Sequence, residues 1–207
     1  MEINKDPRYA VLASGSGTIF QSIIDAQKRG DIPGELALFL TDKQDCQAKT
    51  RAEKAGIETR VFQPKNYTSK QAMEEEMLAV LTAQEIDYVV LAGYLRILSP
   101  EFIRNFRHRI INTHPSLLPA FKGLDAVKQA YDHGVKVTGC TVHLVTEELD
   151  SGPILLQEEV KVQRHDSLDE LREKIKNKER RLIITAIRAL LKGEVIVDNH
   201  KRWVVEN

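Results

Sequence analysis

The chain has 207 residues, enough for one ordinary domain with a hydrophobic core and no cross-links. Its 30 Lys and Arg balance 30 Asp and Glu, so bulk charge gives no reason to expect a nucleic-acid or membrane partner. Cys46 and Cys140 are the only cysteines, too few for a disulfide framework. The longest apolar runs are strand-sized and residues 1–7 lack the features of a secretory signal, so a cytoplasmic location is expected.

Short apolar runs alternate with stretches of helical periodicity, the pattern of successive βα units. Strands are predicted at 9–13, 36–40, 59–62 and 88–91, and helices at 19–28, 47–54 and 69–84. The run 88–91 is hydrophobic throughout, as expected for a central strand covered on both faces. Pro100 is expected to open a short helix, and residues 109–112 form the next predicted strand.

The second half predicts a strand pair, 137–145 and 154–162, joined by the turn 147–153. Asp166 or Ser167 can cap a long last helix, with Glu170 placed for a capping box from Ser167 and Gly193 as the stop. A minor hairpin follows at 194–205. We therefore predict one α/β domain over residues 1–207. It has a single doubly wound, mostly parallel, Rossmann-like sheet, a later antiparallel strand pair and a long C-terminal helix. Such sheets bind ligands outside the carboxyl ends of their strands.

A glycine-rich loop, Ser14-Gly15-Ser16-Gly17-Thr18, lies between the first predicted strand and helix. Glycines there let backbone N–H groups approach an anion, and the helix N-terminus adds a favourable dipole. The loop lacks the Lys of a Walker A motif, and the third glycine of a dinucleotide fingerprint would fall at Phe20. A single phosphate monoester fits best, and a tight turn without a ligand is the alternative.

Asn112 and His114 lie two positions apart at a strand end, so their side chains point to the same side. A carboxamide beside an imidazole can stabilise a developing oxyanion and move a proton, as acyl transfer to an amine requires. Asp150 is the best candidate to orient and charge the imidazole. A structural histidine at the strand end is the alternative for His114. His143 could line the site, although a hydrogen-bonded strand histidine is the favoured interpretation.

Other chemistries find little support in the sequence. No Ser or Cys lies in a recognisable nucleophile elbow, which argues against covalent catalysis. The six histidines show no metal-ligand spacing, so no metal is expected.

Four segments carry a specific resemblance: 91–99, 112–119 (Asn-Thr-His-Pro-Ser-Leu-Leu-Pro), 137–143 and 148–153 (Glu-Leu-Asp-Ser-Gly-Pro). Together they closely resemble the folate-dependent formyltransferases, in one order and over roughly residues 8–197. The N-terminal glycine loop narrows the resemblance to the phosphoribosylglycinamide formyltransferase branch, which serves purine biosynthesis.

This resemblance implies a reaction and a set of roles. The formyl group of 10-formyltetrahydrofolate would pass to the amine of 5-phosphoribosylglycinamide, giving the N-formyl product and tetrahydrofolate. Asn112 would bind the formyl oxygen, His114 would act as acid or proton relay, and Asp150 would keep His114 charged. The acceptor positions would be Gly15, Ser16, Gly17, Thr18, Ile19, Lys176 and Glu179. The folate positions would be Lys70, Leu95, Arg96, Ile97, Leu98, Thr146, Glu147, Glu148 and Leu149.

Two departures and several alternatives stay open. The family loop commonly ends Gly-Ser-Asn, whereas this chain has Gly17-Thr18-Ile19, and a histidine that many members carry is absent from 123–127. A hydrolase on the same scaffold would release formate from the donor. Transfer to a sugar nucleotide or a charged tRNA would use the same three residues, but those relatives generally carry a further domain. A non-catalytic mononucleotide-binding module is the rival of a different class. The sequence does not choose between a monomer and a homodimer.

Overall fold

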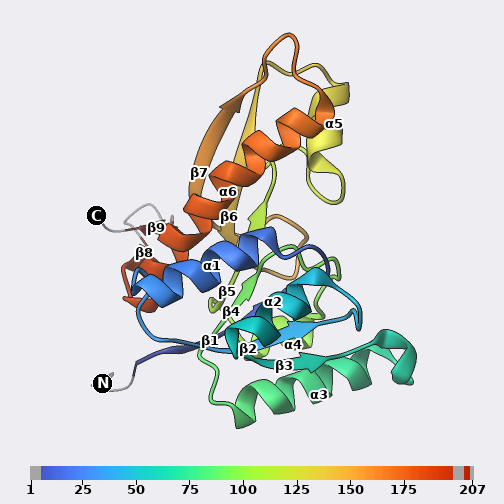
Figure 1. Cartoon of the computed structure of the whole chain (residues 1–207), viewed down its shortest axis with the longest axis vertical. Helices are drawn as coiled ribbons and strands as arrows, with labels where there is room; N and C mark the ends of the chain where they lie inside the picture. Colours follow the sequence, from blue (N-terminus) through green and yellow to red (C-terminus); the bar gives the residue numbers. More distant parts are fainter. Residues whose placement is uncertain (1–5, 198–202, 206–207) are drawn as a thin grey trace. The chain divides into compact units, whose positions relative to one another are not determined.

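The computed structural model describes residues 6–197 and 203–205 (Figure 1). Its main sheet has seven strands in the order β3-β2-β1-β4-β5-β6-β7. The chain divides into two compact units, residues 1–111 and 112–207, and strand β5 (Ile110–His114) spans the boundary. Each unit is described separately below. Among the described residues, no helix combines the length and apolar character needed to cross a membrane.

The first unit is a run of parallel βα units. Strand β1 pairs in parallel with β2 and β4, and β2 pairs in parallel with β3. The elements are β1 (Arg8–Leu12), α1 (Thr18–Arg29), β2 (Glu35–Thr41), α2 (Gln47–Ala55), β3 (Glu58–Val61), a 3-10 helix (Pro64–Asn66), α3 (Lys70–Ala83), β4 (Tyr88–Leu91) and α4 (Pro100–Asn105). Every strand and helix predicted for this half is confirmed, and only the 3-10 helix was not predicted.

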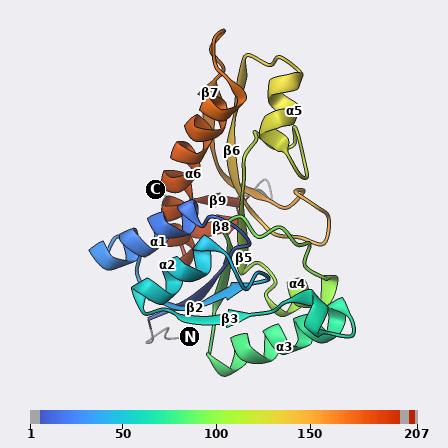
Figure 2. The ribbon, with the colours of Figure 1, turned by 45° about the vertical axis from the view of Figure 1, so that its right-hand side comes forward.

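Apolar side chains on both faces of the sheet explain this arrangement. Residues 9–12 of β1 are buried on both faces, and Phe20 of α1 stacks on Phe39 of β2 with 4.6 Å between ring centroids. Helices α1 and α2 cover one face of strands β1 to β3 and α3 covers the other (Figures 1 and 2). The carboxyl ends of these strands carry the glycine loop and residues 92–99.

The second unit is built on an antiparallel strand pair and one long helix. Strand β6 (Val137–Leu144) pairs antiparallel with β7 (Ile154–Lys161), as predicted. Helix α6 (Leu168–Leu191) begins with the predicted capping box between Ser167 and Glu170. It packs Leu171 and Ile175 against Cys140 and Val160 of the strand pair. The two strands of the predicted terminal hairpin are present as β8 (Val195–Val197) and β9 (Trp203–Val205), which pair antiparallel, and residues 198–202 between them lie outside the described residues.

Two details differ from the prediction. Helix α5 (Ala126–Asp132) was not predicted: it has only seven residues and its cap, Asp125, has φ +55° and makes no capping hydrogen bond through its side chain. Strand β5 ends at His114 rather than at residue 112. Pro115 keeps the residue before it extended, so the strand conformation continues through His114.

Candidate active site

The end of strand β5 presents polar side chains to both of its faces. Asn112 and His114 share one face, and Thr113 between them points to the other. There the Thr113 hydroxyl donates a 2.9 Å hydrogen bond to Glu179 of α6. Thr113 and His114 are buried, although both carry polar groups.

The imidazole of His114 has a partner at each ring nitrogen. Nδ1 lies 3.4 Å from Oδ2 of Asp150, and Nε2 lies 2.8 Å from the carbonyl oxygen of Phe121. A carbonyl can only accept, so Nε2 carries a hydrogen and donates it to Phe121. The predicted pairing of His114 with Asp150, 36 positions along the chain, is therefore present within the second unit.

Local backbone geometry fixes Asp150. Its φ is +48°, a left-handed conformation that Asp adopts more readily than most residues, and the backbone N–H of Gly123 donates to its Oδ2 at 2.8 Å. Close by, a Cβ added to Gly152 would lie 1.8 Å from the carbonyl oxygen of Leu144. Only glycine fits at this position, so the backbone of residue 152 lies directly against Leu144 and closes the turn between β6 and β7 that carries Asp150.

His143 of β6 joins the same cluster. Its Nδ1 lies 2.9 Å from the carbonyl of Leu144 and therefore donates, so a neutral ring accepts at Nε2. Nε2 lies 3.2 Å from Nδ2 of Asn112 and 3.7 Å from Oδ1 of Asp150. Burial lowers the pKa of His143, although the Leu144 carbonyl and the Asp150 charge oppose the shift. A neutral His143 thus accepts one N–H of Asn112 and leaves the other for a ligand.

His143 is the hydrogen-bonded strand histidine that the sequence favoured, and it also contacts two of the three predicted catalytic residues. The signal for this second role was weak. In an antiparallel pair, the turn after a strand returns the chain beside that strand's end, which places Asp150 near His143. The sequence interpretation did not use that geometry.

A hydrogen-bond network centred on the buried Thr141 holds the loop that follows His114. The Thr141 hydroxyl donates to the carbonyl of Ser116 at 2.7 Å and accepts from the N–H of Leu118 at 3.1 Å. Gln157 donates to the carbonyl of Leu118 at 3.0 Å and to the Thr141 hydroxyl at 2.9 Å. Thr141 is fully buried, so its partners are essential to it. Thr141 and Gln157 lie more than 20 positions from the loop that they hold, so no local sequence pattern marks this network.

The carbonyls of Gly15 and Ser16 in the glycine loop accept hydrogen bonds from helix α2 of the same unit. The N–H of Ala48 donates to Gly15 O at 3.1 Å and Arg51 Nε donates to Ser16 O at 3.0 Å. In the described part of the chain, the backbone N–H groups of residues 15–19 have no acceptor, and no side chain caps α1. Gly17 has φ +65°, and a Cβ there would lie 2.7 Å from Ala48. These free N–H groups at a helix N-terminus can hold an anion.

The predicted folate positions of the first unit form an apolar surface beside fixed polar groups. Leu95 and Ile97 are 65% and 63% exposed, whereas Leu98 is buried. The Leu95 N–H donates to the Ser14 hydroxyl at 3.0 Å, which ties this segment to the glycine loop. Arg96 Nε is buried without a hydrogen-bond partner among the described residues. Lys70 begins α3 and lies 3.6 Å from Glu74.

The remaining predicted positions belong to the second unit. Thr146, Glu147, Glu148 and Leu149 lie in the turn that leads to Asp150, and Leu149 is 48% exposed. Lys176 forms a 2.9 Å ion pair with Glu173 on the surface of α6. Glu179 is buried against Thr113, and burial raises the pKa of its carboxyl to about 7. Within the described ranges, no group of three or more His, Cys, Asp or Glu side chains is arranged to hold a metal ion.

Comparison with known proteins gives consistent matches. The formyl transferase family model matches residues 7–187. The chain is 39% identical to the phosphoribosylglycinamide formyltransferase of Bacillus subtilis over 184 residues, which cover 89% of this chain and 94% of that protein. The crystal structure of glycinamide ribonucleotide transformylase 1 from Symbiobacterium toebii has a TM-score of 0.93 at 41% identity, covering 97% of this chain and 94% of that one.

A longer relative also matches. The trifunctional purine biosynthetic protein adenosine-3 of Bos taurus is 40% identical over 205 residues, which cover 98% of this chain. The same residues cover 20% of that protein, so the chain spans about a fifth of its length.

Proposed function

Because the chain belongs to the formyl transferase family, and within it to the phosphoribosylglycinamide formyltransferases, we propose that it formylates 5-phosphoribosylglycinamide with 10-formyltetrahydrofolate. The products would be the N-formyl compound and tetrahydrofolate, in purine biosynthesis. The observation that carries the proposal is the cluster of half-buried Asn112 with buried His114, His143 and Asp150 at the end of β5. The predictions of a cytoplasmic location and of a single domain rest on the sequence, and the choice between monomer and homodimer stays open.

The proposed reaction is direct transfer. The amine nitrogen attacks the formyl carbon, a C–N bond forms, and the carbonyl electrons move onto the oxygen. Collapse of this intermediate breaks the bond to the folate nitrogen, which takes up the proton that the amine loses. The two needs are an anion-stabilising donor and a proton carrier near the same carbon.

Asn112 suits the first need. Its second Nδ2 hydrogen can donate to the developing oxyanion, because the neutral His143 accepts the first and so fixes which way the carboxamide faces. A pre-oriented donor does not have to reorganise during the reaction, which is the main source of such stabilisation.

His114 suits the second need. As an imidazolium it would face Asp150 through Nδ1 and Phe121 through Nε2. Asp150 would stabilise the imidazolium before the transfer, and the Nε2 proton becomes available to a substrate when the bond to Phe121 opens. Donation leaves a neutral ring that still carries its Nδ1 hydrogen toward Asp150 and can take up the proton that the amine loses. The proton passes to the folate nitrogen through His114 or through water near Asp150.

Substrate binding would use the other predicted positions. The free N–H groups of residues 15–19 would hold the acceptor phosphate, and Thr18 keeps the hydroxyl that the family pattern has there. Ile19 offers only its backbone. The exposed Leu95, Ile97 and Leu149 would contact the folate rings, and Lys70 would lie close to the donor. Lys176 and Glu179 would contact the acceptor from α6.

The test is an absorbance assay of 10-formyltetrahydrofolate consumption with and without 5-phosphoribosylglycinamide. We expect consumption that depends on the acceptor and yields one N-formyl product per donor consumed. Formate release at the same rate without acceptor would identify a hydrolase instead. Thermal stabilisation by a mononucleotide with no turnover would identify a binding module.

A further inference from the structure

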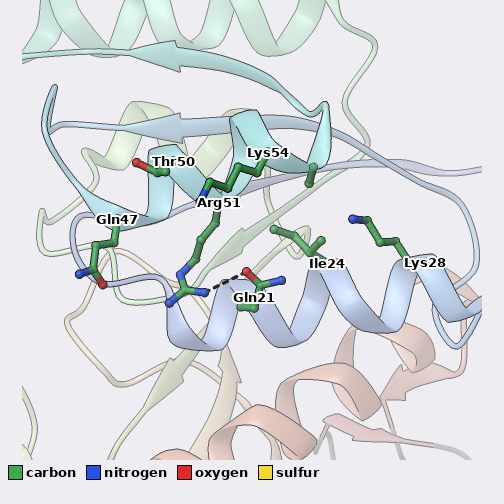
Figure 3. A pocket seen from close by; sticks show the side chains of 8 residues that line it. Gln21, Ile24, Lys28, Gln47, Thr50, Arg51 and Lys54 are labelled. Carbon is green, nitrogen blue, oxygen red and sulfur yellow. Dashed lines mark hydrogen bonds between the residues drawn. The ribbon is translucent and has the colours of Figure 1, made fainter.

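A hollow of about 510 Å³ lies between helices α1 and α2, wholly within the first unit (Figure 3). Its volume is in the range of small-molecule sites. No carboxylate lines it, and its polar residues can all donate hydrogen bonds. It is lined by Gln21, Ile24, Lys28, Gln47, Thr50, Arg51, Lys54 and Ala55.

The cations on these two helices fall into two groups. Arg29 and Lys49 lie outside the hollow, and each is neutralised by an ion pair, with Asp31 at 2.7 Å and Glu53 at 3.0 Å. Lys28, Arg51 and Lys54 line the hollow, and none of them pairs with a carboxylate among the described side chains. The cations of α1 and α2 that lack a carboxylate partner among the described side chains thus all line this hollow, and Lys28 also lines an adjoining hollow that contains Glu35 and Glu58.

Arg51 is the most informative of the three. Lys28 and Lys54 lie in the last turns of their helices, where a cation stabilises the helix dipole without any ligand. Arg51 does not, and its guanidinium is held: Nε donates to Ser16 O at 3.0 Å and Nη1 donates to Gln21 Oε1 at 2.9 Å (Figure 3). Among the described residues, two of its five N–H donors are used, so a fixed fork with three free donors remains.

We propose that this hollow binds an oligophosphate, a chain of two or more linked phosphates. A fixed guanidinium fork suits tetrahedral phosphate oxygens, and two nearby ammonium groups suit a ligand that spreads several negative charges along its length. Gln47 and Thr50 supply neutral donors beside them. The site adjoins the glycine loop through the bond from Arg51 to Ser16 O, but its donors are side chains, whereas those of the loop are backbone N–H groups.

The experiment titrates the purified full-length protein with tripolyphosphate by calorimetry at low ionic strength. The Lys28→Gln/Lys54→Gln variant should bind at least about tenfold more weakly than wild type, because two of three charge-assisted contacts are lost. The matched control is Arg29→Gln/Lys49→Gln, which makes the same charge change on the same two helices. It should bind within about twofold of wild type. Amide NMR shifts should move in residues 47–55, not only in the glycine loop.

Further ligands define the chemistry. ATP that binds as tightly as tripolyphosphate would show that the phosphate chain alone is recognised, and tighter binding of ATP would show that a nucleoside adds contacts. Both results support an oligophosphate site. Citrate binding as tightly as tripolyphosphate, equal losses in both double variants, or shifts confined to residues 15–19 would each overturn the proposal.

Discussion

Replacing Glu179 by Gln should stabilise the protein at neutral and alkaline pH. Burial raises the pKa of this carboxyl to about 7, while the Thr113 hydrogen bond and the charges of Lys176 and Arg180 act in the opposite direction. The side chain is 4% exposed and its Oε1 accepts from Thr113 at 2.9 Å. Gln keeps that acceptor and the size of the side chain but carries no charge.

The size of the stabilisation follows from the pKa of this carboxyl in the unfolded chain, 4.5, and in the folded chain, about 7. At a pH well below 4.5 the carboxyl is protonated in the folded and the unfolded chain, so its titration does not affect stability. Between pH 4.5 and about 7 only the unfolded chain releases the proton, so the free energy of unfolding falls as pH rises. Above about pH 7 the loss is complete at about 3 kcal/mol, since each pKa unit corresponds to about 1.4 kcal/mol.

Urea denaturation at pH 5 and pH 8 measures this directly. The Glu179→Gln variant should exceed wild type by about 3 kcal/mol at pH 8 and by less than about 1 kcal/mol at pH 5. The control is Glu173→Gln on the exposed side of α6, which loses the ion pair with Lys176 and should not gain stability at pH 8. Equal effects of Glu179→Gln at both pH values would show that burial does not control this carboxyl.

Substitutions of His143, Gly17 and Thr141 further test the local geometry. His143→Leu removes the acceptor that orients Asn112, so kcat should fall about tenfold to a hundredfold with little change in KM in steady-state kinetics. An unchanged kcat would show that His143 does not orient Asn112 for catalysis. Because burial lowers the pKa of His143, the unfolded chain binds a proton below pH 6.5 that the folded chain does not, and the wild-type protein should lose stability there. The His143→Leu variant should not show this loss, which calorimetric melting at several pH values would measure. Gly17→Ala should lower the free energy of unfolding in urea by about 1–3 kcal/mol, because position 17 has a positive φ and the added Cβ would contact Ala48. Gly15→Ala is the control: its Cβ would meet open space, so the free energy of unfolding should change by less than about 0.5 kcal/mol. Thr141→Val should lower it by about 1–3 kcal/mol, because the Leu118 N–H loses its acceptor and Gln157 keeps only its bond to the Leu118 carbonyl. A stability equal to wild type would show that water replaces the hydroxyl.

The sequence predicted the parallel half of the fold and the start of α6 well because their signals are local. The strand at 88–91 is uniformly hydrophobic, and Ser167 with Glu170 is a capping motif that can be identified within four residues. Helix α5 lacks such signals. Its N-cap residue, Asp125, has a left-handed backbone conformation and makes no side-chain capping hydrogen bond, so the usual capping pattern does not mark where the helix starts.

The candidate site shows the same division. The partnership of His114 with Asp150 could be predicted from residue types and the resemblance to a family. The roles of Thr141 and Gln157 could not, because they depend on hydrogen bonds to the loop after His114 from strands that follow it by more than 20 positions. The Phe121 carbonyl that accepts from His114 is likewise a backbone group, and its position follows from the fold rather than from the identity of Phe121.

The rate of formyl transfer by the Asn112→Ala variant tests the central claim most directly. If Asn112 donates to the oxyanion, its loss should reduce the rate about a hundredfold to a thousandfold, while the circular dichroism spectrum and melting temperature stay close to wild type. Asn105→Ala, which removes a carboxamide on the exposed surface of α4, serves as the control and should transfer at the wild-type rate. A folded Asn112→Ala protein that transfers formyl groups within about fivefold of wild type would contradict the account.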